Sequence, residues 1–382
     1  MTDLTDRLTV LVLTYNRYPR LRRLLRYVQA TGLRCAIRVL DSSTDPIPDG
    51  VARLLAEAPI EHRRYDPAIH PIAKQAHAAA EVTTPYTVLW CDDDLLVPRG
   101  LQAAVEWLEN FPEYSAATGR AVLFVTHEGH DRPPCLPYTQ RPLEQPTATD
   151  RLLDHFSGAT VLNYAVHRTA NLRRNLQICE AHALHFNWAE LLLSALDAIQ
   201  GLVKQMDRLY FLKEAHAANE AWADRVDDRA FGRAEDLAWI FEPGSATKAR
   251  AFLDELAQSL AAADALPIAR ARQIVSLGFD EYLCRTLFDE QGKLERAIWP
   301  ERPSWRARAL RGPMLAPVWR AIRPLVQRRR PFTREALSAD KRYRADFATA
   351  YQIILEESRP APASTAGSHA PQEQAAAATR SA

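Results

Sequence analysis

The sequence lacks several features that would assign it to a common class of protein. Its 48 Lys and Arg residues nearly cancel its 47 Asp and Glu residues, which argues against a nucleic-acid-binding protein. The five cysteines are an odd number without CxxC spacing, which argues against a disulfide framework or a zinc site and favours a reducing compartment. No segment approaches the roughly 20 apolar residues of a membrane span, and the N-terminal apolar run is too short for a signal peptide. We therefore expect a cytoplasmic protein.

Glycine-rich phosphate loops are missing as well. The chain contains neither GxxxxGK[ST] nor GxGxxG, the motifs whose backbone N–H groups commonly hold a diphosphate. A diphosphate would therefore have to be held by a metal ion and by Lys or Arg side chains. At 382 residues, with 47% hydrophobic residues, the chain can still bury a sizeable core.

The first 125 residues or so alternate between strand and helix patterns. Strands are predicted at residues 8–15, 35–43, 60–65 and 87–91, with amphipathic helices between them. The first of these runs is continuous and apolar, as in strands that are buried on both faces. This order predicts an α/β fold, in which helices flank a mainly parallel sheet and ligands bind beyond the carboxyl ends of its strands.

Polar clusters occur at three of these strand ends: residues 14–17, 41–43 and 92–94. The second cluster is also good turn chemistry when considered alone. The third is three consecutive aspartates, whose repulsion requires something positive nearby. Carboxylate oxygens suit Mg²⁺ or Mn²⁺, which keep open positions for water or phosphate. Three polar strand ends in one crevice predict a binding site.

Three segments together resemble a known family. VLVLTYNR, VLDSSTD and TPYTVLWCDDDLLVP are similar to the layout of family 2 glycosyltransferases with the GT-A fold, over roughly residues 8–215. The resemblance implies an enzyme that depends on Mn²⁺ or Mg²⁺ and takes a sugar from a nucleoside-diphosphate sugar, commonly a UDP-sugar. The acceptor would be a glycan, a lipid-linked molecule or another hydroxyl compound, and the stereochemistry would be inverted.

The resemblance also implies roles for residues around the nucleotide. Asp41 would contact the nucleobase. The turn after the first strand would border the nucleotide, and it contains Thr14, Tyr15, Asn16 and Arg17. Lys74 matches a position where the family often has a basic residue near the nucleotide, although it could equally be a solvated helix lysine.

The metal and diphosphate contacts are assigned in the same way. By identity, Asp92 and Asp94 are the metal-binding pair, with Asp93 as a further candidate for the donor site. Counting back from Pro98 instead places Cys91 where a first aspartate often stands. Some relatives have a histidine metal ligand or a basic diphosphate contact after a later strand, which makes His216 and Lys213 candidates.

Residues 186–201 predict a helix with a polar first turn. The resemblance implies that Glu190 is the general base there. The alternative is a capping box, because Asn187 precedes Glu190 by three residues. Asp197, two helical turns later, is a weaker candidate for the base. Trp188 could stack on a sugar or simply pack.

A strand is predicted at residues 162–169, and its His167 is a possible acceptor contact. Residues 132–146 predict an irregular, Pro-rich rim of the active site.

The predicted domain organisation has three parts. Residues 1–225 form the GT-A domain, residues 226–357 form a C-terminal helical region, and residues 358–382 are a low-complexity, disordered tail. Within the helical region, residues 302–330 contain nine arginines and no acidic residue. This composition suggests peripheral contact with an anionic membrane, or a solvated basic face.

Two other functions remain compatible with these patterns. A nucleotidyltransferase acting on sugar phosphates also uses aspartates and Mg²⁺ on an α/β sheet, but it usually begins with a Gly-rich, basic loop. A non-catalytic protein that binds nucleotide sugars could keep the fold without turnover.

Overall fold

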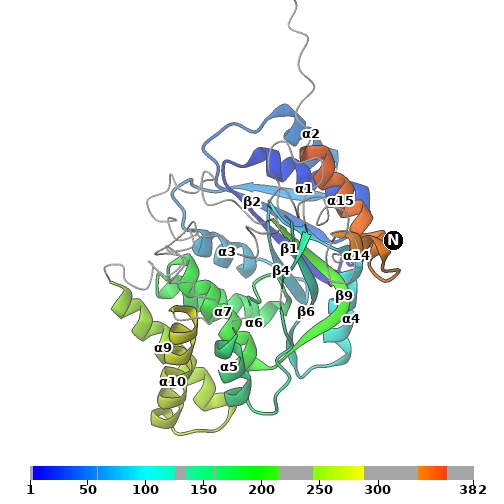
Figure 1. The fold of residues 1–382 in the computed structure, drawn as a ribbon. Coiled ribbons are helices and arrows are strands. Elements are labelled where there is room, and N and C mark those ends of the chain that lie inside the picture. Colours follow the sequence, from blue (N-terminus) through cyan, green and yellow to red (C-terminus); the bar gives the residue numbers. More distant parts are fainter. Residues whose placement is uncertain are drawn as a thin grey trace, which may run out of the picture.

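The computed structural model describes residues 3–57, 59–124, 135–138, 140–158, 161–214, 244–287 and 334–358. In this part of the chain, a nine-stranded sheet is covered by helices (Figure 1). The predicted α/β class is confirmed. None of the described helices combines the length and the apolar character that a membrane crossing requires.

The N-terminal half of the sheet is parallel, in the order β3-β2-β1-β4. Its strands are β1 (Leu8–Thr14), β2 (Ala36–Asp41), β3 (Ile60–Arg64) and β4 (Tyr86–Cys91). In the register, Thr14 pairs with Asp41 and Leu13 pairs with Cys91. The predicted polar clusters therefore leave the sheet at the same edge.

The sheet continues beyond β4 with mixed pairing. The short β8 (Val166–Arg168) lies antiparallel between β4 and β6 (Tyr114–Phe124), and β6 pairs in parallel with β9 (Leu202–Glu214). β9 also pairs with β5 (Leu95–Leu96), which brings the end of β9 next to the aspartates.

Two predictions for this half of the sheet were wrong in extent. The strand expected at residues 162–169 is reduced to β8, because residues 162–165 form a turn in which the Ala165 N–H donates to the Leu162 carbonyl. Within the expected irregular rim, β7 (Cys135–Tyr138) is a strand, because the edge of β6 offers it a pairing partner.

Helices cover both faces of the sheet because its strands are apolar on both sides. In β1, Val10 and Val12 belong to one hydrophobic core, whereas Leu11 between them belongs to the other. This is the period-two alternation of a doubly covered strand. The helices of the first core are α1 (Tyr18–Thr31), α2 (Asp49–Glu57) and α4 (Pro98–Asn110); those of the second are α3 (Pro71–Ala80), α5 (Ala148–Ser157), α6 (Thr169–Ala181) and α7 (Phe186–Gln200).

Helix α1 forms as predicted, with its apolar stripe buried. Gly32 ends it in the left-handed region at φ 61°, where a residue without Cβ is favoured. The predicted helix at residues 186–201 is confirmed as α7.

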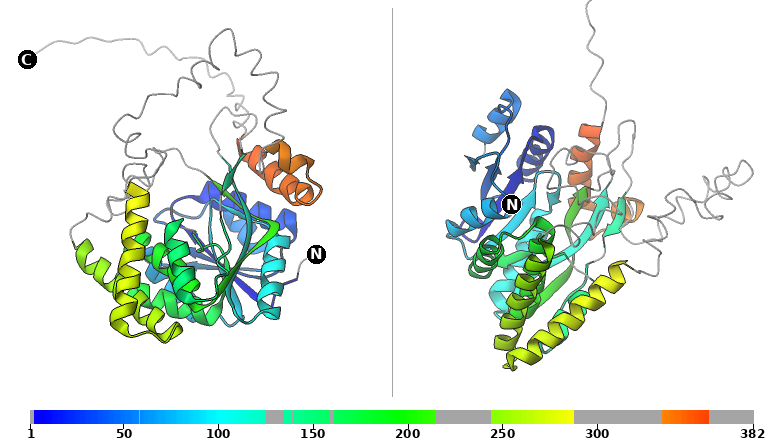
Figure 2. Two further views of the ribbon diagram at one scale, coloured as in Figure 1. Left: turned by 60° about the horizontal axis from the view of Figure 1, so that its bottom comes forward. Right: turned by 90° about the vertical axis from the view of Figure 1, so that its left-hand side faces the viewer.

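The C-terminal helices pack at two separate places (Figure 2). α9 (Ser245–Ala263) and α10 (Ile268–Leu287) extend the second core beside α5 and α7. α14 (Arg334–Ala339) and α15 (Arg344–Ser358) extend the first core, where Arg26 of α1 pairs with Glu356 of α15 at 2.5 Å. The predicted basic segment 302–330 and the tail after residue 358 lie outside the described residues.

A buried ion pair joins β8 to α7. His167 Nδ1 lies 3.0 Å from Asp197 Oδ2, and both side chains are almost fully buried. Burial disfavours the imidazolium, but the charge and hydrogen bond of Asp197 outweigh it and raise the pKa of His167. His167 and Asp197 are thus buried partners of each other, which favours a structural role over an acceptor contact or an alternative base.

We predict that Asp197→Asn lowers the free energy of unfolding by about 3 kcal/mol, because it leaves a buried imidazole without its counter-ion. A folded pKa above the unfolded value of about 6.5 gives stability that is lost as the pH rises through the folded pKa. The penalty should therefore be larger near pH 6 than above pH 8. Urea denaturation at both pH values measures it.

The control is Asp254→Asn, which breaks an exposed pair with Arg272 and should cost less than about 1 kcal/mol. A loss for Asp197→Asn no larger than this control would contradict the assignment.

Candidate functional site

Asp92, the first residue after β4, lies under the site. It is fully buried, accepts a hydrogen bond of 2.7 Å from Thr14 Oγ1, and forms an ion pair with Arg17. Burial raises the pKa of Asp92, and Arg17 opposes the rise. Arg17 and Thr14 both contact this carboxylate, and Asp92 is not part of the group of potential metal ligands formed by its neighbours.

Arg17 also holds the next carboxylate. Its Nη1 donates to Asp93 Oδ2 at 2.8 Å. Burial works against the charge on Arg17, but Asp92 and Asp93 outweigh it and raise its pKa. One guanidinium therefore offsets most of the repulsion between two consecutive carboxylates.

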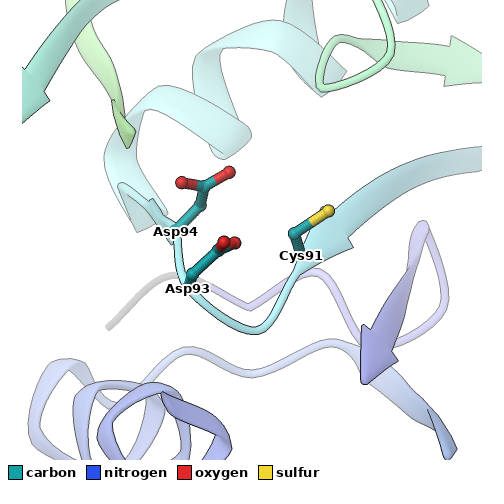
Figure 3. Close-up of side chains that lie close together, drawn as sticks. All are labelled: Cys91, Asp93 and Asp94. Carbon is teal, nitrogen blue, oxygen red and sulfur yellow. The ribbon is translucent and has the colours of Figure 1, made fainter. Parts of the chain in front are cut away.

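The potential ligands of a metal ion are Cys91, Asp93 and Asp94 (Figure 3). In this group, one ligand atom from each residue lies within 4.8 Å of the others. Two carboxylates suit a hard divalent cation, and the thiol adds a softer donor. These residues can therefore hold a metal ion, and the grouping favours the frame counted back from Pro98 over the pair Asp92 and Asp94.

Two neighbouring elements hold the acidic turn. Arg23 of α1 donates to the Asp93 carbonyl at 2.6 Å and pairs with Glu214 at the end of β9. The Glu214 N–H in turn donates to Asp94 Oδ1 at 2.8 Å. Arg23 and Glu214 are both buried. Arg23 stands between Arg22 and Leu24 in a helix with several arginines, and nothing in that pattern singles it out. Its burial depends on the approach of β9, which local periodicity cannot show.

Lys213 connects the acidic turn to the second half of the site. Burial disfavours its ammonium group, but Asp94, Tyr138 and Glu190 outweigh burial and raise its pKa. Its Nζ lies 4.9 Å from the centroid of the Tyr164 ring. Lys213 therefore stays charged near both the acidic turn and Glu190. Burial raises the pKa of Tyr138; Lys213 opposes the rise, and Glu190 and Asp94 add to it. Nothing in the sequence pattern singled out Tyr138.

Glu190 does not cap its helix. The N-cap of α7 is His185, whose Nδ1 accepts a hydrogen bond from the Asn187 N–H at 3.4 Å. Asn163 Nδ2 donates to Glu190 Oε1 at 3.1 Å. The capping-box alternative is therefore wrong. Burial raises the pKa of Glu190, and Lys213 partly opposes the rise. A partly exposed carboxyl group with a raised pKa has the properties of a general base.

Trp188, two residues before Glu190, faces away from this site into the second core. Its ring centroid lies 5.2 Å from that of Phe252 and 5.7 Å from that of Phe279. It is buried, which confirms packing rather than sugar stacking.

Asp41, at the end of β2, is occupied by protein groups. Its Oδ2 accepts from Tyr18 at 3.0 Å and from Arg64 at 2.9 Å, and it lies 3.0 Å from His62 Nε2. The Ser43 N–H donates to Oδ1 at 2.8 Å. Burial favours the protonated acid, but the hydrogen bonds from His62 and Ser43 outweigh it and lower the pKa of Asp41. Asp41 is thus a buried anion that fixes its neighbours.

The remaining predicted nucleotide contacts join the ends of β1 and β2. Lys74 is buried, not solvated, and its Nζ donates to Ser42 Oγ at 2.8 Å and to the Thr14 carbonyl at 3.2 Å. Asn16 has a left-handed φ of 51° and accepts from the Thr44 N–H at 2.9 Å. Tyr15 lies beside it and is partly exposed. His216 lies outside the described residues.

A surface groove of about 610 Å³ lies between α4 and the first half of β9, where Trp107, Phe111 and Asp207 are among its lining residues. None of the residues that line it is a candidate site residue. It is therefore separate from the acidic turn.

No protein-family profile matches this chain, and no curated protein matches it in sequence. Solved structures with similarity include S. aureus TarS 1–349 in complex with UDP-GlcNAc, at 15% identity and a TM-score of 0.47, covering 92% of this chain and 90% of that one. A longer TarS structure is similar at 15% identity and a TM-score of 0.45; the matched part is 92% of this chain but 55% of TarS. The mannosyltransferase PcManGT from Pyrobaculum calidifontis, in complex with GDP-Man and Mn²⁺, is similar at 18% identity and a TM-score of 0.38, covering 94% and 88%. Identities and scores this low do not assign a substrate or an activity.

We predict that Arg17→Met lowers the free energy of unfolding by about 3–5 kcal/mol, because it leaves Asp92 buried without its counter-ion. The double variant Arg17→Met/Asp92→Asn should recover a large part of this loss, since the uncompensated charge is then gone. Urea denaturation of both variants measures the difference.

The matched control is Arg22→Met, an exposed position on α1, which should change stability by less than about 0.5 kcal/mol. Equal stability of the single and double Arg17 variants would show that Arg17 does not compensate Asp92.

Proposed function

We propose that this protein is a glycosyltransferase that moves a sugar from a nucleoside-diphosphate sugar, with a UDP-sugar as the first candidate, to a hydroxyl acceptor. The observation that carries the proposal is the pairing of two groups across Lys213. On one side is the Cys91, Asp93 and Asp94 group, and on the other is Glu190 with its raised pKa. A cation-binding group beside a carboxylate base suits displacement of an anionic leaving group by a hydroxyl.

The reaction is a single displacement. Glu190 takes the proton of the acceptor hydroxyl, the oxygen forms a bond to the anomeric carbon, and the bond from that carbon to the diphosphate oxygen breaks. Attack from the side opposite the leaving group inverts the anomeric centre. Asn163 orients Glu190 through its hydrogen bond to Oε1.

The departing diphosphate needs positive charge. Lys213 remains charged near Asp94 and Glu190 and is placed to receive the diphosphate. Asp93 and Asp94, together with Cys91, would hold Mn²⁺ or Mg²⁺. The chemistry that a bound divalent cation supplies here is stabilisation of the negative charge that develops on the diphosphate.

The nucleoside would lie at the ends of β1 and β2. Asp41 already receives hydrogen bonds from Tyr18, Ser43 and Arg64. We propose that Asp41 acts through Arg64, whose side chain is 43% exposed, by holding the guanidinium at the base-binding edge. Lys74 fixes the backbone of the β1 end in the same region.

We predict that UDP raises the melting temperature in the presence of Mn²⁺ but not in excess EDTA. A ligand that binds the native state at a hundredfold excess over Kd stabilises it by about 2.7 kcal/mol. Thermal shift with UDP, Mn²⁺ and EDTA in all combinations measures the effect. Equal stabilisation in EDTA would contradict metal-dependent binding.

The same titration tests the ligands. Asp93→Asn and Asp94→Asn should each abolish the Mn²⁺-dependent part of the shift, since each removes a carboxylate from the group that can hold the cation. Asp280→Asn, at an exposed position on α10, should keep the full shift. Unchanged shifts in both Asp93 and Asp94 variants would place the metal site elsewhere.

We predict that Glu190→Gln lowers the transfer rate by a factor on the order of 10² to 10⁴, which corresponds to about 3–5 kcal/mol of barrier. Glutamine can still accept the hydrogen bond from Asn163 but cannot take a proton. Donor binding and melting temperature should therefore stay near those of the wild type. Near-normal turnover in this variant would remove Glu190 from the reaction.

A further inference from the structure

The thiol of Cys91 occupies a position in the site that the chemistry of hard cations does not explain. Cys91 is the last residue of β4 and is partly exposed, whereas the five residues before it in the strand are buried. Its Sγ and the carboxylate oxygens of Asp93 and Asp94 lie within 4.8 Å of one another. Cys91 projects from the end of β4, and Asp93 and Asp94 project from the turn that follows it (Figure 3).

The spacing is compatible with shared coordination. A zinc-like cation has bonds of about 2.3 Å to sulfur and 2.0–2.2 Å to carboxylate oxygen. Ligand atoms around one tetrahedral ion of this kind are about 3.5 Å apart, so the three side chains, whose ligand atoms lie within 4.8 Å of one another, would rotate toward a shared ion when it binds.

The groups around the sulfur support a role as a ligand. The Tyr164 hydroxyl donates to Cys91 Sγ at 3.4 Å, and the Tyr164 ring is stacked on Phe211 with centroids 4.5 Å apart. A hydrogen bond from a rigid neighbour fixes the direction of a ligand atom. Lys213 also contacts this tyrosine, since its Nζ lies 4.9 Å from the centroid of the Tyr164 ring.

We infer that Cys91 binds the metal ion of this site through sulfur and makes the site prefer a borderline cation, such as Co²⁺ or Zn²⁺, over Mg²⁺. This inference rests on the proposed metal-dependent function. Sulfur is a soft donor, whereas Mg²⁺ is bound almost entirely by oxygen. On binding, the metal–sulfur bond replaces the S–H bond, and the proton leaves to solvent. An aspartate at this position would suit Mg²⁺ better than the cysteine does.

The test is a titration of the full-length protein with Co²⁺, followed by optical absorption. A cobalt ion bound to a thiolate has a strong near-ultraviolet charge-transfer band in addition to its weak visible bands. Wild type should show the band. Cys91→Ser and Cys91→Asp should lose it while keeping the visible bands of bound cobalt. Cys284→Ser, which removes an exposed thiol, should keep it.

Competition with Mg²⁺ provides the second measurement. In the Cys91→Asp variant, Mg²⁺ should displace Co²⁺ at a concentration on the order of 10 to 100 times lower than in wild type, the usual size of a change in ligand environment. Melting temperatures check that the variants are folded. If one of the two Cys91 variants does not fold, the spectrum of the other decides the question, and absence of the band in wild type counts against Cys91 without any variant.

The outcomes distinguish failure of the sulfur ligand from failure of the metal site as a whole. Visible bands of bound cobalt in wild type without a charge-transfer band, or a band that persists in Cys91→Ser, would overturn the role of Cys91 but leave the metal site intact. No cobalt binding by wild type would overturn both the sulfur ligand and the metal-dependent part of the proposed function. Transfer of sugar measured in EDTA would report on that function independently.

Discussion

The structure of the site depends on how Arg17 neutralises two adjacent carboxylates. Consecutive aspartates at a buried strand end repel one another, and in a medium of low dielectric constant this repulsion is costly. Arg17 contacts both Asp92 and Asp93, and Thr14 donates a hydrogen bond to Asp92 Oδ2. With Asp92 buried beneath this guanidinium, Asp93 and Asp94 are left to turn toward Cys91. The geometry of the ligand group thus follows from an interaction inside the protein.

The second constraint is that the site joins parts of the chain that are distant in sequence. Arg23 of α1 donates to the backbone of the acidic turn, and the N–H of Glu214, the last residue of β9, donates to the Asp94 side chain. Arg23 and Glu214 also form an ion pair. The charge of Lys213 is stabilised both by Asp94 in this turn and by Glu190. Because β5 pairs with β9, the acidic turn and Lys213 belong to neighbouring strands of one sheet, and a change at the end of β9 should affect the acidic turn.

Much of this arrangement could be predicted from local patterns. The apolar run at residues 8–15 predicted a doubly buried strand. The polar strand ends were predicted to come together, and the parallel register brings Thr14, Asp41 and Cys91 to one edge. Local patterns did not show which polar side chains are buried or which groups they contact. Lys74 and Arg23 look like solvated helix residues until the packing of other elements encloses them. The pairing of His167 with Asp197 and of Asn163 with Glu190 required the turn at residues 162–165, which has no periodic signal.

The central claim is that the acidic turn and Glu190 together transfer a sugar from a nucleoside diphosphate. The most direct measurement is the nucleotide product formed when the protein is incubated with a panel of nucleoside-diphosphate sugars, Mn²⁺ and hydroxyl acceptors, followed by mass spectrometry. The account predicts that one donor is converted to its nucleoside diphosphate, while its sugar is transferred to the acceptor or released as free sugar by hydrolysis. Donors that bind but remain intact, or a product that is a nucleoside triphosphate made from added diphosphate, would contradict it.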